Sequence, residues 1–137
     1  MGKTVVVYWS GTGNTEMMAQ EVAKGAQADL FTADAFDAAK AEGYAALAFG
    51  CPSMGAEELE DGEFEPMFSA VKDKLSGKKL ALFGSYDWGD GEWMRTWQEE
   101  CEGLGAVMVA DGLIANLTPD EDALAACRDL GEKLAQG

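Results

Sequence analysis

The 137-residue chain has no histidine, only ten lysine and arginine residues, and only three cysteines. Without histidine it lacks the commonest metal ligand and the usual base of a hydrolytic triad. Cys51, Cys101 and Cys127 lie far apart, in neither the paired C-x-x-C spacing of a zinc site nor a disulfide framework. We therefore expect no metal site and no catalytic nucleophile, and we interpret the cysteines as buried or partly exposed thiols.

The few cations accompany 25 aspartate and glutamate residues, which gives a net charge of -15. Proteins that bind nucleic acids or anionic membranes need cations to meet phosphate groups, so the composition argues against both classes. No apolar run reaches the roughly 20 residues of a membrane span, and residues 4–9 are too short for a signal-peptide core. We expect a cytoplasmic protein whose acidic excess either keeps it soluble or steers it to basic partner proteins.

Apolar, β-branched runs alternate with segments of helical periodicity along the chain. We expect strands at residues 4–9, 28–32, 44–50, 79–84 and 106–115, the last interrupted at 111–112. We expect helices at residues 14–26, 36–42, 64–75, 92–104 and 118–135, the last with Thr118 at its cap and Pro119 in its first position. Strands separated by helices require a parallel sheet covered on both faces. Residues 1–137 are therefore predicted to form one domain, a three-layer α/β/α sandwich with a five-stranded parallel sheet.

Three loops follow strands and precede helices: residues 10–15, 51–63 and 85–91. In parallel sheets, ligands bind beyond the carboxyl ends of the strands. The first loop, Ser-Gly-Thr-Gly-Asn-Thr, offers hydroxyls and glycines at a helix start, which suits a phosphate. It has no lysine and matches neither glycine-rich nucleotide motif, which favours a bound monophosphate over one being transferred. A polar turn that only caps the helix would have the same composition.

The tryptophans are expected in two kinds of environment. Trp88 lies among glycine and polar residues with little apolar sequence to bury it, so a flat ligand stacked on the indole would remove that exposure. Trp93 and Trp97 are four residues apart and are expected on the buried face of a helix. Trp9, at a strand end beside the first loop, is either a wall of the ligand site or part of the core.

Residues 6–15, Val-Val-Tyr-Trp-Ser-Gly-Thr-Gly-Asn-Thr, resemble the signature of the flavodoxin family, and the resemblance continues through residues 50–58 and 82–91. It covers nearly the whole chain and is strongest to the short-chain, clostridial-type flavodoxins. It implies strand order 2-1-3-4-5 and non-covalent FMN, in a low-potential one-electron carrier that cycles between semiquinone and hydroquinone. It also implies that the protein is not an enzyme, and that it is a monomer to which redox partner proteins dock at an acidic flavin edge.

The resemblance assigns the FMN phosphate to the loop 10–15 and the flavin ring to the other two loops. Trp88 matches the residue that stacks on the ring, and Met54 matches an apolar contact to it. Gly55 matches the glycine whose carbonyl accepts from the protonated flavin N5, and Glu57 the carboxylate that accepts from N3–H. The expected FMN-binding residues are Trp9, Ser10, Gly11, Thr12, Gly13, Asn14, Thr15, Ser53, Met54, Gly55, Ala56, Glu57, Ser85, Tyr86, Asp87, Trp88, Gly89 and Gly91.

Nine acidic residues lie on the two loops expected to flank the flavin, six in residues 51–65 and three in residues 85–92, with no lysine or arginine in either. Negative charge around the flavin ring disfavours the addition of a second electron, which makes the anionic hydroquinone. It would therefore lower the reduction potential for that electron, and it would also steer partner proteins to the ring. An FMN-dependent quinone reductase, the alternative function, would need a substrate pocket and a nicotinamide site, and the sequence indicates neither. A receiver-type signalling domain would need an aspartate at the end of the third strand, where this chain has Gly50 and Cys51.

Asp87 stands where close relatives usually have glycine, between Tyr86 and Trp88. Its carboxylate adds negative charge near the flavin N1/O2 edge, so we expect it to lower the potential for the second electron further. Asp87→Gly should therefore raise that potential in a redox titration run beside the wild-type protein. An unchanged or lower potential in the variant would contradict this role for Asp87.

Overall fold

The computed structural model describes residues 3–11, 13–54, 58–87 and 89–136. The strands in these ranges are β1 (Lys3–Tyr8), β2 (Asp29–Thr32), β3 (Tyr44–Gly50), β4 (Lys79–Tyr86), β5 (Val107–Met108) and β6 (Leu113–Asn116). The helices are α1 (Asn14–Ala26), α2 (Ala38–Ala41), α3 (Phe64–Val71), α4 (Glu92–Gly103) and α5 (Glu121–Ala135), with 3₁₀ turns η1 (Ala33–Ala35) and η2 (Lys72–Lys74). Across the same ranges, no helix is long and apolar enough to cross a membrane.

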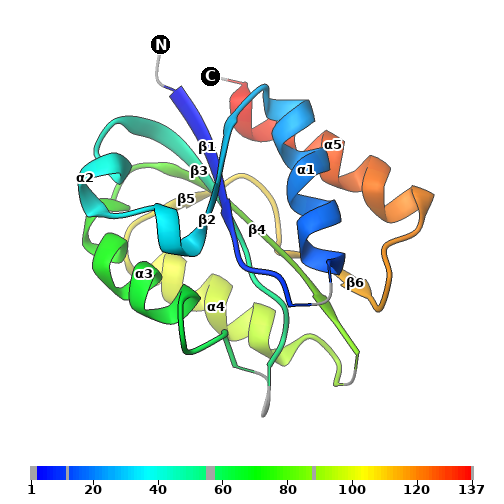
Figure 1. The fold of residues 1–137 in the computed structure, drawn as a ribbon. Coiled ribbons are helices and arrows are strands. Elements are labelled where there is room, and N and C mark those ends of the chain that lie inside the picture. Colours follow the sequence, from blue (N-terminus) through cyan, green and yellow to red (C-terminus); the bar gives the residue numbers. More distant parts are fainter. Residues whose placement is uncertain (1–2, 12, 55–57, 88, 137) are drawn as a thin grey trace.

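The sheet is parallel, with strand order β2-β1-β3-β4-β5, and β6 also pairs with β4. Helices α1 and α5 cover one face of it, and α3 and α4 cover the other (Figure 1). The predicted α/β/α sandwich and the order 2-1-3-4-5 are thus confirmed. Because β5 and β6 pair with successive parts of β4, they fill one strand position, and the sheet is five strands wide.

Alternate residues of the central strands face opposite layers. In β1, Val5 and Val7 belong to the core cluster shared with α3 and α4, whereas Val6 and Tyr8 belong to the cluster shared with α1 and α5. Both clusters exclude water from the sheet, which is why the residues of this strand from Val5 to Tyr8 are all apolar, rather than every second one.

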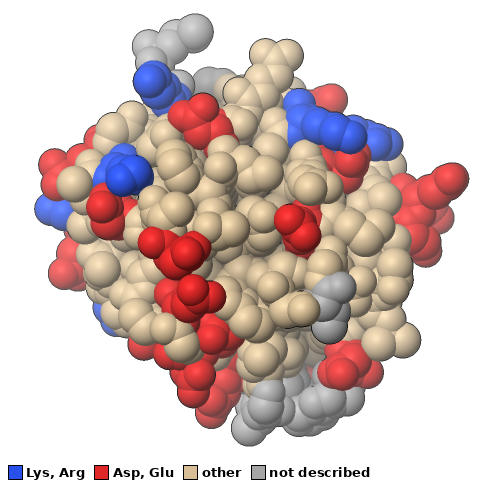
Figure 2. All heavy atoms as spheres, in the orientation of Figure 1, with Lys and Arg blue, Asp and Glu red and all other residues tan. Residues whose placement is uncertain are grey.

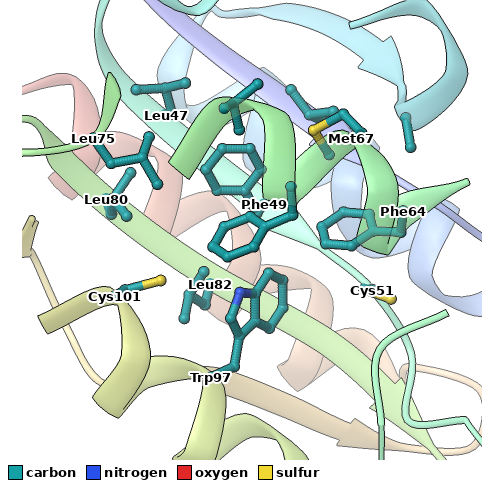
Figure 3. Close-up of a cluster of buried hydrophobic side chains, with 14 of the residues drawn as sticks. Leu47, Phe49, Cys51, Phe64, Met67, Leu75, Leu80, Leu82, Trp97 and Cys101 are labelled. Atoms are coloured by element: carbon teal, nitrogen blue, oxygen red, sulfur yellow. The ribbon is translucent and has the colours of Figure 1, made fainter. Parts of the chain in front are cut away.

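Trp93 and Trp97 lie in the core under α4, as their spacing predicts, and both are buried. The Trp97 ring stands edge-on to Phe64, with ring centroids 5.4 Å apart, and Phe49 lies beside them (Figure 3). Edge-to-face contacts of this kind add to the stability gained from burial. These two tryptophans are therefore core residues.

Three elements differ in extent from the prediction. The last strand is interrupted more widely than at residues 111–112, because β5 ends at Met108 and β6 begins at Leu113. Gly112 in this break lies against α4, where a Cβ atom would come within 2.4 Å of Met94 Cγ. The helix expected at 36–42 is reduced to α2 after η1, and the helix expected at 64–75 ends at Val71 and continues as η2.

The predicted start of the last helix is wrong. The N-cap of α5 is Asp120, whose carboxylate accepts a hydrogen bond from the Ala123 N–H at 2.8 Å. Pro119 therefore precedes the cap instead of occupying the first helical position, and Thr118 lies outside the helix. An ionised carboxylate is favoured at the positive end of a helix dipole, which explains why Asp120 caps it in preference to Thr118.

Helix α1 packs closely against α5 through two glycines. A Cβ atom on Gly25 would lie 2.0 Å from the Arg128 carbonyl oxygen, and one on Gly131 would lie 2.1 Å from the Val22 carbonyl oxygen. The buried Glu21 of α1 also accepts from Arg128 Nη1 at 2.6 Å. The position of α1 on the sheet therefore depends on its contact with α5.

Gly131→Ala should lower the free energy of unfolding by about 1–3 kcal/mol, because the added methyl group forces the two helices apart. Gly103→Ala in α4 is the matched control, since a Cβ atom there meets nothing within 4 Å. That variant should be neutral or more stable by up to about 1 kcal/mol. Urea unfolding measures both, and equal stability of the two variants would show that the α1–α5 contact is not tight.

Candidate cofactor site

β1 and β3 end level with Phe83 of β4, which continues to Tyr86. Tyr8 pairs with Gly50, and Gly50 pairs with Phe83. The ladder continues past the strand ends, where the Trp9 N–H donates to the Gly50 carbonyl at 3.0 Å and the Cys51 N–H donates to the Phe83 carbonyl at 3.1 Å. The loops that follow β1, β3 and β4 are therefore held side by side.

A cleft of about 250 Å³ opens between these loops. Its lining combines aromatic and apolar side chains with hydroxyl, amide and carboxylate groups, from Trp9, Gly11, Asn14, Pro52, Ser53, Met54, Ser85, Tyr86, Asp87 and Leu117. All three loops selected from the sequence contribute to it. A mostly apolar lining with a few convergent polar groups is typical of a cofactor pocket.

Helix α1 begins at this cleft with a glycine, which has no side chain of its own to cap the helix. Its N-cap is Gly13, at a φ of 95°, and the Met17 N–H donates to the Gly13 carbonyl at 3.1 Å. By contrast, α2 and α5 start at Asp37 and Asp120, whose carboxylates accept from the first turn. The N-cap of α1 offers its first N–H groups no such acceptor, and the helix dipole favours an anion there.

Two hydroxyls of the loop 10–15 have partners within the protein. The Gly13 N–H donates to Ser10 Oγ at 3.0 Å, which closes the loop. The buried Thr15 hydroxyl lies 2.9 Å from Ser85 Oγ in the loop after β4. The Ser85 carbonyl in turn accepts from the Ser53 N–H at 3.0 Å, so Ser85 connects all three loops.

The turn after β3 is closed by Met54 and Glu58, each of which donates its N–H to the carbonyl of the other at 2.8 Å. This pairing leaves the Met54 side chain 37% exposed at the rim of the cleft. Five residues expected to contact FMN are not among those that the structure describes: Thr12, Gly55, Ala56, Glu57 and Trp88. Their roles stay predictions.

Eight of the expected residues line the cleft: Trp9, Gly11, Asn14, Ser53, Met54, Ser85, Tyr86 and Asp87. The other described ones belong to the same loops but stand outside the lining: Ser10, Gly13, Thr15, Gly89 and Gly91. Gly91 caps α4 at a φ of 92°, as Gly13 caps α1. Trp9, which the sequence leaves between wall and core, is partly buried and belongs to both, because it lines the cleft and also packs against the core cluster under α3 and α4.

Comparison with known proteins agrees with this geometry. The family model for flavodoxin matches residues 6–131. The chain is 47% identical to the flavodoxin of Clostridium beijerinckii, with 95% of this chain and 97% of that protein covered. It is 44% identical to the flavodoxin of Megasphaera elsdenii, with 96% and 97% covered. The chain belongs to the flavodoxin family. It binds FMN and carries electrons, and it is not an enzyme.

Solved flavodoxin structures share the fold along almost the full length. The solution structure of two-electron reduced Megasphaera elsdenii flavodoxin superposes with a TM-score of 0.84 at 40% identity, covering 98% of this chain and 99% of that one. The crystal structure of oxidised flavodoxin 1 from Bacillus cereus gives a TM-score of 0.86 at 29% identity, covering 98% and 97%. The strand order is thus that of the flavodoxin fold.

Two lining residues of this flavodoxin cleft, Pro52 and Leu117, are not among the expected ones, and Leu117 lies outside the three loops selected from the sequence. Leu117 follows β6 at a φ of 58° and is 54% exposed. Its N–H donates to the Tyr86 carbonyl at 2.7 Å, which fixes it beside the loop after β4. The rule that ligands bind at the carboxyl ends of parallel strands also applies to the interrupted fifth strand, and it would have selected this loop.

The acidic segment after β3 is partly built into the fold. The Glu60 carboxylate is buried and accepts from the N–H groups of Gly62, Glu63 and Phe64, each at 2.8 Å, at the start of α3. Burial acts to raise the pKa of Glu60, but the hydrogen bonds from Phe64, Glu63 and Gly62 outweigh it and hold the pKa below its ordinary value of 4.5. Glu60 therefore stabilises this loop as well as adding to its charge.

The three cysteines are all buried, and burial raises the pKa of each thiol to about 12. The thiols are therefore protonated at neutral pH and are poor nucleophiles. Among the described residues, no group of histidine, cysteine, aspartate and glutamate side chains could hold a metal ion.

Glu60→Gln should lower the free energy of unfolding by about 2 kcal/mol at pH 7, because an amide oxygen accepts weaker hydrogen bonds from the three N–H groups. The folded-state pKa lies below the unfolded value of 4.5, so the charged carboxylate stabilises the fold above that pH. This contribution is lost as the pH falls through the folded-state pKa.

Urea unfolding at a series of pH values checks this prediction. The difference between Glu60→Gln and wild type should shrink below pH 4.5. Asp61→Asn, at the exposed neighbouring position, is the control and should change stability by less than about 0.5 kcal/mol. A difference that stays constant across the pH range would show that the Glu60 charge does not cap α3.

Proposed function

We propose that the cleft between the loops 10–15, 51–63 and 85–91 holds FMN, with its phosphate at the start of α1. The N-terminus of α1 carries this proposal, because the helix begins at the cleft with Gly13 at a φ of 95°, which has no side chain to stand between the helix and a ligand. A phosphate there would accept from N–H groups and lie at the positive end of the helix dipole. Since the loop contains no lysine or arginine, its neutral donors would hold the anion.

The expected residues divide between the two ends of the cofactor. We assign the phosphate end to Ser10, Gly11, Thr12, Gly13, Asn14 and Thr15. We assign the ring end to Trp9, Ser53, Met54, Gly55, Ala56, Glu57, Ser85, Tyr86, Asp87, Trp88, Gly89 and Gly91. Leu117 joins the ring end, because Met54 and Leu117 expose apolar surface at the rim that a flat ring system would cover.

When bound, FMN supplies the one-electron chemistry, and the chain binds and orients it. The loop positions depend on backbone hydrogen bonds to the sheet and on the Thr15–Ser85 contact, all within the protein. Because these interactions join protein groups to one another, they support the shape of the cleft independently of contacts to the cofactor. This preorganisation supports a tightly held, non-covalent cofactor.

We further propose that acidic side chains guide redox partner proteins to the cleft. Asp87 lines it, and Glu58 and Asp61 are exposed on the loop after β3. In Figure 1 the carboxyl ends of the strands point toward the lower edge of the molecule. In Figure 2, drawn in the same orientation, acidic side chains extend to this lower edge, while most of the visible lysines and arginines lie higher. Such a field attracts a basic partner surface and opposes negative charge on the cofactor, which lowers its reduction potential.

The remaining parts of the proposal concern the state of the protein. We propose that residues 1–137 act as a single FMN-binding domain and as a monomer in the cytoplasm, passing electrons between redox enzymes at low potential. The single sheet that runs from β1 to β6 supports one domain. The net charge of -15 supports a monomer, because copies of the chain repel one another.

Gly13→Ala should weaken FMN binding about tenfold, because a Cβ atom at this positive φ costs roughly 1–2 kcal/mol and distorts the phosphate end of the cleft. The affinity for riboflavin, which lacks the phosphate, should change less than about twofold. Fluorescence titration of the apoprotein with each flavin measures both affinities.

Gly77→Ala is the matched control for this experiment. Like Gly13, Gly77 has a positive φ, 79°, and a Cβ atom on either glycine meets nothing within 4 Å. Gly77 differs in its place, because it lies just before the amino end of β4, whereas the cleft lies at the carboxyl end. This variant should lose similar stability and keep its FMN affinity. Equal losses of FMN and riboflavin affinity in Gly13→Ala would contradict the placement of the phosphate.

A further inference from the structure

The indole of Trp9 borders two cavities. One is the cofactor cleft, and the other is a second cavity of about 210 Å³, lined by Tyr8, Trp9, Ser10, Glu16, Thr32, Asp34 and Glu63. The Trp9 side chain is only partly buried. The indole also packs against the core cluster under α3 and α4, but the two cavities leave part of the ring uncovered, so a wall built from Trp9 gains definition from a contact that fixes the ring.

Glu63 supplies that contact. Trp9 Nε1 donates to Glu63 Oε1 at 2.9 Å, across 54 positions of sequence. The backbone of Trp9 is fixed by its hydrogen bond to Gly50, and one edge of the ring lies against Gly11, where a Cβ atom would come within 3.0 Å of Trp9 Cη2. Neither of these contacts sets the direction of the indole N–H, whereas a hydrogen bond to a carboxylate is directional and charge-assisted.

The backbone of Glu63 is itself linked to the sheet. The Glu63 N–H donates to Glu60 Oε1 at 2.8 Å, and the Glu60 N–H donates to the buried Cys51 Sγ at 3.3 Å, directly after β3. Glu63 occupies the N-cap position of α3, but its side chain makes no capping hydrogen bond. The carboxylate is thus directed to Trp9 instead of to its own helix.

We propose that Glu63 is a positioning residue of the cofactor cleft, because its carboxylate holds the Trp9 indole as a wall. The inference rests on the proposed binding of FMN in this cleft. It gives a specific role to a side chain that the sequence presents only as one of several surface charges. Without the Glu63 acceptor, the indole can turn toward the second cavity, and FMN meets a less defined wall.

Three substitutions separate the hydrogen bond from the charge. Glu63→Ala removes both, Glu63→Gln removes the charge but keeps an oxygen acceptor, and Asp61→Ala removes one charge from the same turn and leaves the Trp9 contact intact. The Glu60 carboxylate still caps α3 in all three, so each variant is expected to fold.

The first measurement needs no cofactor. The indole ¹H–¹⁵N resonance of Trp9 in the apoprotein is assigned by its absence in Trp9→Phe. In Glu63→Ala it should move upfield, because the N–H loses its acceptor, and in Glu63→Gln and Asp61→Ala it should stay close to its wild-type position.

The second measurement is FMN affinity. Glu63→Ala should bind FMN about three- to tenfold more weakly, and the other two variants should change less than about twofold. In the Trp9→Phe background, which has no indole N–H, Glu63→Ala should cause no further loss.

Equal losses in Glu63→Ala and Asp61→Ala would overturn the proposal, because charge alone would then explain them. An unshifted Trp9 resonance in Glu63→Ala would overturn it as well. Failure of the wild-type protein to bind FMN would instead count against the proposed function and leaves the resonance test standing.

Discussion

Parallel hydrogen bonding among β1, β3 and β4 is the constraint on which the cofactor cleft depends. β1 and β3 end in register at Tyr8 and Gly50, level with Phe83 of β4, and the ladder continues into the loops that follow β1 and β3. Gly50 allows this close approach, because a Cβ atom there would lie 2.1 Å from the Phe83 ring. Since a strand fixes the start of each loop and a helix packed on the sheet fixes its end, the loops can present irregular backbone to a ligand without losing their positions.

In the proposed arrangement, the cleft combines a neutral anion site with an acidic border. The start of α1 offers backbone N–H groups and a helix dipole instead of a cation, whereas Asp87 and the segment after β3 bring negative charge to the other end. Part of that charge is ordered by the fold, because Glu60 caps α3 and Glu63 accepts from Trp9. The field that partners and cofactor experience is therefore fixed by the same interactions that shape the walls.

Most of the fold could be predicted from the sequence, because the signals are local. The run at residues 44–50 coincides with β3, and the spacing of Trp93 and Trp97 places both in the core. Local signals do not decide which of two nearby residues caps a helix. At the start of α5, Asp120 is the N-cap instead of Thr118. Long-range contacts were also beyond local reasoning, and Ser85 and Glu63 gain their roles from residues 70 and 54 positions away.

The central claim is that backbone N–H groups at the start of α1 hold the FMN phosphate without help from a cation. A phosphate monoester in water takes up its second proton near pH 6. Donors that favour the dianion should keep the bound phosphate deprotonated below that pH. In a ³¹P NMR titration of the FMN-bound protein between about pH 5 and 8, the account predicts a resonance that does not move, while free FMN titrates. A bound resonance that titrates as free FMN does would place the phosphate in solvent and contradict the account.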